Sequence, residues 1–218
     1  VSCLVTLELT GITVSFNSAP LEWWLSLPII VIYPLLFGWV SYQTATKLAE
    51  HKRRLQVMST RDGMTGVYNR RHWETMLRNE FDNCRRHNRD ATLLIIDIDH
   101  FKSINDTWGH DVGDEAIVAL TRQLQITLRG SDVIGRFGGD EFAVIMSGTP
   151  AESAITAMLR VHEGLNTLRL PNTPQVTLRI SVGVAPLNPQ MSHYREWLKS
   201  ADLALYKAKK AGRNRTEV

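Results

Sequence analysis

Residues 135–146 read Gly-Arg-Phe-Gly-Gly-Asp-Glu-Phe-Ala-Val-Ile-Met, and this stretch decides the expected fold. Two adjacent glycines and an acidic residue between two apolar-rich runs predict a tight β-hairpin. A turn alone does not need the consecutive carboxylates Asp140 and Glu141, because like charges side by side repel each other and require a compensating positive group. Gly138 and Gly139 carry no Cβ, so another molecule can approach the backbone closely. Taken alone, the stretch leaves a plain structural turn open as the alternative.

A second acidic motif follows the apolar run at 91–96, Ala-Thr-Leu-Leu-Ile-Ile. Such a run predicts a buried central strand, with Asp97 and Asp99 at its carboxyl end. If this strand neighbours the hairpin, both aspartates converge with the two hairpin carboxylates. Oxygen ligands of this kind suit Mg²⁺, which proteins hold through one or two carboxylates, completed by substrate phosphates and water. The pattern therefore predicts metal-assisted phosphoryl or nucleotidyl transfer.

Further motifs occur in a fixed order along the chain. They are Arg-Asp-Gly-Met-Thr-Gly-Val-Tyr-Asn-Arg-Arg at 61–71, Asp-Ile-Asp-His-Phe-Lys at 97–102, Asn-Asp at 105–106, Gly-His at 109–110, Gly-Asp at 113–114, and a closing series formed by Ala201-Asp202, Ala204-Leu205-Tyr206, Ala208-Lys209 and Gly212-Arg213-Asn214. With the Gly-Gly-Asp-Glu-Phe of the hairpin, they resemble the motifs of the GGDEF family, the bacterial diguanylate cyclases. The resemblance covers roughly residues 58–216, and Met64 and Val67 are mild departures from the family pattern.

The resemblance implies an α+β fold, the ferredoxin-like palm of GGDEF domains and other nucleotidyl cyclases, preceded by a transmembrane helix and a linker helix. Apolar periodicity independently indicates an α+β sandwich with a largely antiparallel sheet. The expected helices span about 69–86, 111–128, 151–168 and 194–211, and the expected strands span 91–99, 133–137, 142–146 and 176–184.

The family resemblance assigns a metal-binding role to part of this constellation. It implies that Asp97 and Asp140 bind Mg²⁺, two ions per active site with Mn²⁺ as a substitute, together with the backbone carbonyl of Ile98. Asp140 and Glu141 are the expected catalytic carboxylates, and Glu141 binds a second metal ion or activates the 3′-hydroxyl. Asp99 matches the motif and is expected either to take part or only to support the site. A solvated strand end is the alternative for Asp97.

The same resemblance implies a GTP site. Lys102, Lys209 and Arg213 supply positive charge suited to a triphosphate, and Lys102 is also expected to be catalytic. Asn105 and Asp114 match the positions that hydrogen-bond the guanine edge. Gly138 and Gly139 let the nucleotide lie over the hairpin. The alternatives are helix caps for the asparagine and aspartate, and an exposed helix charge for Lys209.

Arg129-Gly130-Ser131-Asp132 is an Arg-x-x-Asp pattern separated by five residues from Gly138. By resemblance, Arg129 and Asp132 form the inhibitory site at which the product, cyclic di-GMP, binds. Arginine can grip phosphate and guanine, and aspartate can accept hydrogen bonds from a guanine edge. The bare pattern is common by chance, so the prediction depends on its distance from the hairpin.

The segment before the catalytic motifs is strongly apolar. The chain has 218 residues, enough for one sizeable core plus a short second segment. No charged side chain occurs at 23–46, and tryptophans lie near both ends of an apolar run long enough to cross a bilayer. We therefore predict a transmembrane helix at about 23–42. A buried core helix is the alternative, although Pro28 and Pro34 fit it poorly.

The flanking charges predict the orientation and the domain boundaries. Lys47 and the basic residues at 52–54 follow the apolar run, so this end is expected to face the cytoplasm of a bacterium, with the run in the inner membrane. Residues 1–42 are expected to be the C-terminal remnant of a membrane sensor domain, 43–58 a linker or signalling helix, and 59–218 the catalytic domain. A coiled coil that pairs two chains and a solvated linker are both open for the helix.

The resulting hypothesis is a diguanylate cyclase that converts two GTP into cyclic di-GMP and two pyrophosphates, acts as a homodimer, is inhibited by its product, and signals toward biofilm and exopolysaccharide production. The alternative is a catalytically silent GGDEF module that binds GTP or cyclic di-GMP as a sensor. The net charge of +3 arises from basic residues that alternate with acidic ones, so no nucleic-acid partner is expected.

Overall fold

The structure is a computed structural model that describes residues 32–58, 60–171, 173 and 175–218. The chain divides into two compact units, Val1–Met58 and Ser59–Val218. The expected sensor remnant falls mostly on residues 1–31, which lie outside the described residues, as does the first part of the expected membrane span.

The described part of the first unit is helix α2, Tyr33–Met58. The linker helix expected at 43–58 is therefore the second part of a longer continuous helix. Pro34 lies in its first turn, where the missing N–H removes no intrahelical hydrogen bond. Large apolar side chains are exposed along its first part, namely Tyr33, Leu35, Leu36, Phe37, Trp39 and Val40. Among the described residues, no helix combines the length and apolarity required to span a membrane, so the predicted transmembrane helix is not found there.

The second unit is built on a six-stranded sheet with the order β1-β3-β4-β2-β5-β6. Its strands are β1 Tyr68–Asn69, β2 Ala91–Ile98, β3 Val133–Arg136, β4 Glu141–Ser147, β5 Ile180–Pro186 and β6 Arg215–Glu217. Its helices are α3 Arg70–His87, α4 Phe101–Trp108, α5 His110–Thr127, α6 Ala151–Thr167 and α7 Tyr194–Lys210. The central strands β3, β4, β2 and β5 pair antiparallel, whereas β1 and β6 pair parallel with β3 and β5 at the two edges.

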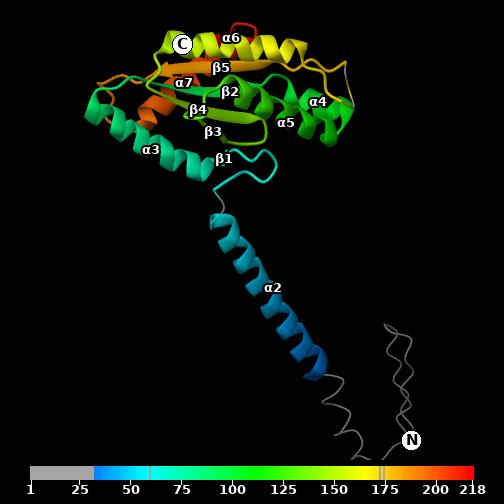
Figure 1. The fold of residues 1–218 in the computed structure, drawn as a ribbon. Coiled ribbons are helices and arrows are strands. Elements are labelled where there is room, and N and C mark those ends of the chain that lie inside the picture. Colours follow the sequence, from blue (N-terminus) through cyan, green and yellow to red (C-terminus); the bar gives the residue numbers. More distant parts are fainter. Residues whose placement is uncertain (1–31, 59, 172, 174) are drawn as a thin grey trace, which may run out of the picture. The chain divides into compact units, whose positions relative to one another are not determined.

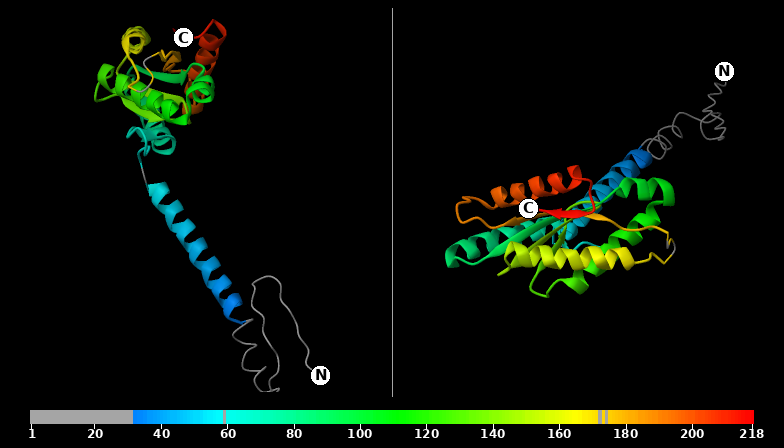
Figure 2. Two further views of the ribbon diagram at one scale, coloured as in Figure 1. Left: turned by 90° about the vertical axis from the view of Figure 1, so that its right-hand side faces the viewer. Right: turned by 90° about the horizontal axis from the view of Figure 1, so that it is seen from above.

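Helices cover both faces of this sheet (Figures 1 and 2). Helices α5 and α6 pack with Leu94 and Ile96 of β2 in one core, and α3 and α7 pack with Leu93 and Ile95 in the other. Every residue of β2 is buried, because successive side chains enter opposite cores. The strand that ends in the acidic motif is thus fixed from both sides.

Close packing of α7 onto the sheet requires a glycine in β5. A Cβ built on Gly183 would lie 2.2 Å from the carbonyl oxygen of Ala201 and 2.2 Å from the amide nitrogen of Leu205, both in the backbone of α7. Only a residue without a side chain permits this approach. Helix α7 therefore lies directly on β5, which fixes the helix that carries Lys209.

Most predicted elements are confirmed, and the exceptions are local. The strand expected at 176–184 begins only at Ile180, although Val176 and Leu178 are buried. Sequence patterns did not indicate the short elements α4, β1 and β6. The sheet is antiparallel at its centre and mixed at its edges, which is the α+β palm architecture that was expected.

Candidate active site

The acidic motifs meet where β2 pairs with β4. The register places Asp97 opposite Glu141, and the amide of Ile98 donates to the carbonyl of Asp140 at 3.3 Å. Asp97 is buried at 8% exposure, Asp140 is half-buried and Glu141 is exposed. Strand pairing therefore brings together three carboxylates from positions more than forty residues apart. They lie at the edge of the sheet formed by the strand ends, where β2 finishes and β4 begins.

A lysine from another element compensates this negative charge. The Nζ of Lys209, near the end of α7, lies 2.7 Å from Oδ2 of Asp97. Burial raises the pKa of Asp97, the hydrogen bond and charge of Lys209 oppose this rise, and the charges of Asp140 and Glu141 add to it. The net rise in pKa shows that one ammonium group only partly offsets the burial and the neighbouring carboxylates. The alternative of a merely exposed helix charge does not describe Lys209.

The donor atoms at this edge suit a magnesium ion whose coordination is completed by phosphate groups of a substrate. Among the described residues, no three His, Cys, Asp or Glu side chains form a ready metal cage. Asp97 and Asp140 offer two carboxylates, and Ile98 between the acidic residues of β2 offers a backbone carbonyl. Mg²⁺ is commonly held by one or two carboxylates and by substrate phosphates, so this sparse set fits it. A divalent cation here would also relieve the unfavourable ionisation of Asp97.

Both carboxylate oxygens of Asp99 accept hydrogen bonds from within the protein. Its Oδ1 accepts from the hydroxyl of Ser181 at 2.7 Å, and its Oδ2 accepts from the backbone amide of Asn214 at 2.9 Å. Asp99 is 6% exposed. This aspartate therefore ties β2 to β5 and to the turn after α7, in agreement with the supporting role that the sequence left open.

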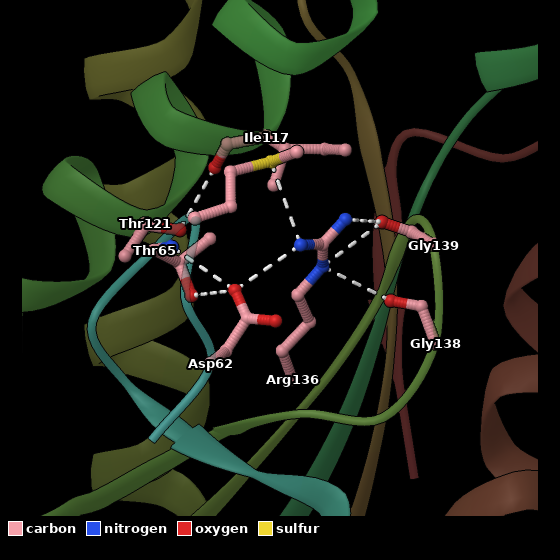
Figure 3. A network of polar contacts seen from close by, with 8 residues as sticks. Asp62, Thr65, Ile117, Thr121, Arg136, Gly138 and Gly139 are labelled. Carbon is pink, nitrogen blue, oxygen red and sulfur yellow. Dashed lines mark hydrogen bonds and ion pairs between the residues drawn. The ribbon is translucent and has the colours of Figure 1, made fainter. Parts of the chain in front are cut away.

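The hairpin tip is braced by an arginine that sequence reasoning did not single out (Figure 3). Arg136 donates to the carbonyls of Gly138 at 3.1 Å and Gly139 at 2.8 Å. Its Nη1 also lies 3.1 Å from Oδ1 of Asp62, which in turn accepts from the amide and hydroxyl of Thr65. Burial raises the pKa of Asp62, but the hydrogen bonds from Thr65 and the hydrogen bond and charge of Arg136 together outweigh this effect and lower the pKa. One planar guanidinium group thus joins the glycine turn to the loop at 62–66.

Phe137, the residue after Arg136, is held by aromatic and cation–π contacts with α3. The ring of Phe137 meets that of Trp73 edge to face at 4.8 Å, and the guanidinium of Arg70 lies 5.0 Å from the centre of the Phe137 ring. The indole of Trp73 also donates to the carbonyl of Val133 at 3.1 Å. Both ends of the connection between β3 and the turn are therefore fixed by residues 62–73, which supplies the rigidity that a precise site needs.

The expected base-binding residues lie on α4 and α5. Asn105 packs so closely against α5 that a Cβ on Gly113 would lie 1.9 Å from its Oδ1. This oxygen is buried against α5 and has no hydrogen-bond partner among the described residues, an unfavourable arrangement that a rotation of the side chain toward a ligand donor would relieve. Asp114 is exposed and lines a cavity of about 550 Å³ beside the segment 168–171. Neither residue caps its helix, because Asn105 lies inside α4 and the cap of α5 is Gly109.

The two other expected phosphate contacts flank the same edge. Lys102 is exposed in the first turn of α4, directly after β2. Arg213 is exposed in the turn after α7, where Asn214 bonds to Asp99. Together with Lys209, they place positive charge around the carboxylates at the end of β2.

Arg129 and Asp132 form a second polar centre, away from this edge. Oδ2 of Asp132 accepts from the backbone amide of Arg129 at 2.9 Å, whereas its Oδ1 is buried without a partner among the described residues. Burial raises the pKa of Asp132, and Arg129 opposes the rise. Two cavities of about 210 and 240 Å³ adjoin the pair, one lined also by Arg160 and the other by Tyr68. The pair has the free acceptor and the space that a bound ligand requires.

Comparisons with known proteins agree with this arrangement. Residues 59–215 match the family described as "Diguanylate cyclase, GGDEF domain". The chain is 35% identical over 159 residues to diguanylate cyclase DosC of Escherichia coli K12, covering 72% of this chain and 34% of DosC. It is 30% identical over 193 residues to the cyclic di-GMP phosphodiesterase NbdA of Pseudomonas aeruginosa, covering 83% of this chain and 25% of NbdA. The chain thus spans about a third or less of the length of these two relatives.

A solved structure gives a similar result for the fold. The coiled coil and GGDEF domain of DgcB from Caulobacter crescentus, in complex with c-di-GMP, superimposes with a TM-score of 0.70 at 28% sequence identity. The match covers 84% of this chain and 98% of that structure. The palm fold expected from the sequence is therefore confirmed.

Asp97→Asn is expected to raise the melting temperature of the metal-free protein at neutral pH, because a neutral amide does not carry the penalty that burial places on an ionised carboxylate. The pKa of Asp97 is raised, so the folded state disfavours its ionised form. This penalty is absent at low pH and appears as the pH rises above the ordinary pKa of aspartate. Thermal melts from pH 4 to 7 test this, with Asp82→Asn on the exposed side of α3 as the matched control. A variant that melts below its parent would contradict the prediction.

Arg136→Ala is expected to speed amide hydrogen exchange at residues 137–141 by about tenfold, which corresponds to about 1.4 kcal/mol of easier local opening. The reason is the loss of the bonds from its guanidinium group to Gly138, Gly139 and Asp62. Arg136→Lys keeps the charge without the planar fork and should be intermediate. Exchange measured by mass spectrometry, with exposed Arg71→Ala as control, decides the matter, and unchanged exchange in Arg136→Ala would count against the bracing role.

Proposed function

This chain belongs to the GGDEF family of diguanylate cyclases, and on that premise we propose that it joins two GTP molecules into cyclic di-GMP and releases two pyrophosphates. The observation that carries the proposal is the meeting of Asp97 with the hairpin carboxylates beside Lys209. This edge combines the oxygen donors of a magnesium site with the positive charge of a triphosphate site. A purely structural domain has no need for a buried, unfavourably ionised aspartate at such an edge.

In the proposed reaction, each 3′-hydroxyl attacks the α-phosphorus of the other nucleotide. A new bond forms between the 3′-oxygen and phosphorus, the bond from the α-phosphorus to the bridging oxygen breaks, pyrophosphate leaves, and the hydroxyl proton passes to solvent or a base. Glu141, exposed beside the site, is the carboxylate we propose to assist this deprotonation or to bind a second metal ion. Lys102, Lys209 and Arg213 bind the triphosphate.

Asn105 and Asp114 select guanine in this proposal. Oδ1 of Asn105, which is unpaired among the described residues, can accept from the exocyclic amine once the side chain rotates toward the ligand, and the Asp114 carboxylate can accept from the N1–H and the amine. Gly138 and Gly139 carry no side chains, so the nucleotide can lie directly over the backbone of the hairpin, with Glu141 beside Gly138.

The expected metal contributes a defined part of the chemistry. Two Mg²⁺ ions, or Mn²⁺ in their place, held by Asp97, Asp140 and the Ile98 carbonyl, would neutralise phosphate charge and lower the pKa of the attacking hydroxyl. The protein's own part is to fix these donors on β2 and β4, where strand pairing and the Arg136 brace limit their movement.

The active form we propose is a homodimer, because one domain holds one GTP and the reaction needs two that face each other. Leu48, exposed in the part of α2 that was expected to be the linker helix, offers a contact for pairing, and the DgcB structure contains a coiled coil beside its GGDEF domain. We also propose attachment to the bacterial inner membrane, with the catalytic unit in the cytoplasm, and an output toward biofilm and exopolysaccharide. The support for the membrane is the uncharged run at 23–46 followed by basic residues.

The second candidate is a silent module that binds GTP or cyclic di-GMP without turnover. Two observations favour keeping it: Lys209 occupies the Asp97 carboxylate at 2.7 Å, and one relative with a matching segment is named as a phosphodiesterase. In this reading the carboxylates would bind nucleotide without assembling two reactive half-sites.

Incubation of the purified protein with GTP and Mg²⁺ tests the proposal directly. Cyclic di-GMP and two equivalents of pyrophosphate are expected from the parent, and Asp140→Ala should lower the rate on the order of 10² to 10³-fold, because the catalytic electrostatic support is lost. Asp82→Ala serves as the matched control at an exposed site. GTP binding without product, even when dimerisation is enforced by a fused dimer, would overturn the cyclase in favour of the sensor.

Product inhibition has a separate test. Arg129→Ala is expected to keep the initial rate and to raise the inhibition constant for cyclic di-GMP by about 10 to 100-fold, since hydrogen bonds to charged groups contribute about 1.5–3 kcal/mol. Exposed Arg86→Ala on α3 is the control. Initial rates measured with added cyclic di-GMP should separate the two variants, and equal inhibition of both would remove Arg129 from the inhibitory site.

A further inference from the structure

The turn that carries Arg213 is held in an unusual backbone conformation. Gly212, Arg213 and Asn214 have φ values of 109°, 62° and 46°, so two consecutive residues with side chains adopt left-handed geometry. Left-handed geometry is disfavoured for residues with side chains and persists only where the surroundings fix it. The turn therefore depends on contacts from outside its own sequence.

Backbone contacts fix one side of the turn. The amide of Arg213 donates to the carbonyl of Ala208 at 3.0 Å, and that of Asn214 donates to Asp99 at 2.9 Å. Beyond the turn, β6 pairs parallel with β5 and lies between α6 and α7 (Figure 2, right). Within this segment, Nε of Arg215 donates to the carbonyl of Arg213 at 3.2 Å, and Nη1 of Arg215 lies 3.8 Å from Oε1 of Glu217.

His162 on α6 adds a side-chain contact to β6. Nε2 of His162 lies 3.2 Å from Oγ1 of Thr216, and the side chain of Asn214 is close enough to His162 to influence the pKa of its ring. His162 is half-buried, and burial lowers its pKa, whereas the neighbouring side chain of Asn214 and the charge of Asp99 oppose this effect. The neutral ring has one donor and one acceptor nitrogen, which matches a hydroxyl and an amide as partners.

We propose that His162 is a positioning residue that presents Arg213 to the triphosphate. It joins α6 to Thr216 of β6, and it adjoins Asn214, whose backbone amide ties the strained turn to Asp99. Arg213 is thereby kept in the turn directly after α7, the helix whose Lys209 ammonium lies at the Asp97 carboxylate. The inference rests on the proposed function, because it assumes that Arg213 binds the phosphates of GTP.

The kinetic consequence differs from that of losing a carboxylate. Arg213 binds phosphate groups in the ground state and in the transition state alike, so weakening its position removes uniform binding. His162→Ala should therefore raise KM for GTP by about tenfold and change kcat by less than about twofold. His162→Gln, which keeps a donor and an acceptor, should recover part of the loss, and exposed Glu163→Ala on the same helix should leave KM unchanged.

A double mutant separates positioning from general damage. If His162 acts through Arg213, then His162→Ala adds nothing further to KM in an Arg213→Ala background, because coupled residues are not additive. Thr216→Val removes the hydroxyl partner while keeping the strand-forming shape, and it should give a smaller rise in KM. An equal effect of His162→Ala with and without Arg213 would overturn the proposal.

Amide hydrogen exchange of residues 212–217 provides a readout that does not need turnover. His162→Ala should exchange faster there than the parent, whereas Glu163→Ala should not. An inactive parent would contradict the proposed function but leave this comparison informative. Unchanged exchange in a folded His162→Ala variant would overturn the positioning role by itself.

Discussion

The antiparallel pairing of β2 with β4 is the constraint on which the rest of the site depends. Its register alone sets Asp97 opposite Glu141, and a slip by one residue would send every side chain of β2 into the wrong core. Because both faces of β2 are buried, the apolar side chains enforce this register strongly. The same packing that stabilises the domain therefore forces carboxylates together, and electrostatic repulsion is tolerated because the cores fix the strands.

The site is built from segments that are distant in the sequence but mutually fixed in space. The loop at 62–66 supports the glycine turn through Arg136. Phe137 is held by Trp73 and Arg70 of α3. The turn after α7 is tied to the end of β2 through Asp99. Each contact joins a chemically important loop to a regular element. Such preorganisation lets flexible-looking turns act with the precision usually provided by helices and strands.

The sequence predicted the elements whose pattern is local and long. Helices α3, α5, α6 and α7 have clear apolar stripes, and Asn69 caps α3 as its side chain suggests, accepting from the amide of His72. The predicted start of β5 at Val176 was wrong, because pairing with β2 determines where β5 begins. The ladder between the two strands ends where Ile98 meets Ile180, so buried Val176 has no partner in this ladder. Helix α4 was not predicted because none of its residues is fully buried. Strand β6 was not predicted because it has only three residues and is defined by its pairing with β5. The acidic residues of the site were recognisable as motifs, whereas the Arg136 brace spans 74 positions and shows only in the structure.

The close approach of α7 to Gly183 has a consequence for how mutational scans of this domain should be interpreted. Any side chain at this position would collide with the backbone at Ala201 and Leu205 and displace the helix that ends beside Lys209. A screen that scores only turnover would rank Gly183 with the residues that bind substrate, although it touches none. Abundance measured in parallel with turnover would distinguish such scaffold positions from those that act on the nucleotide.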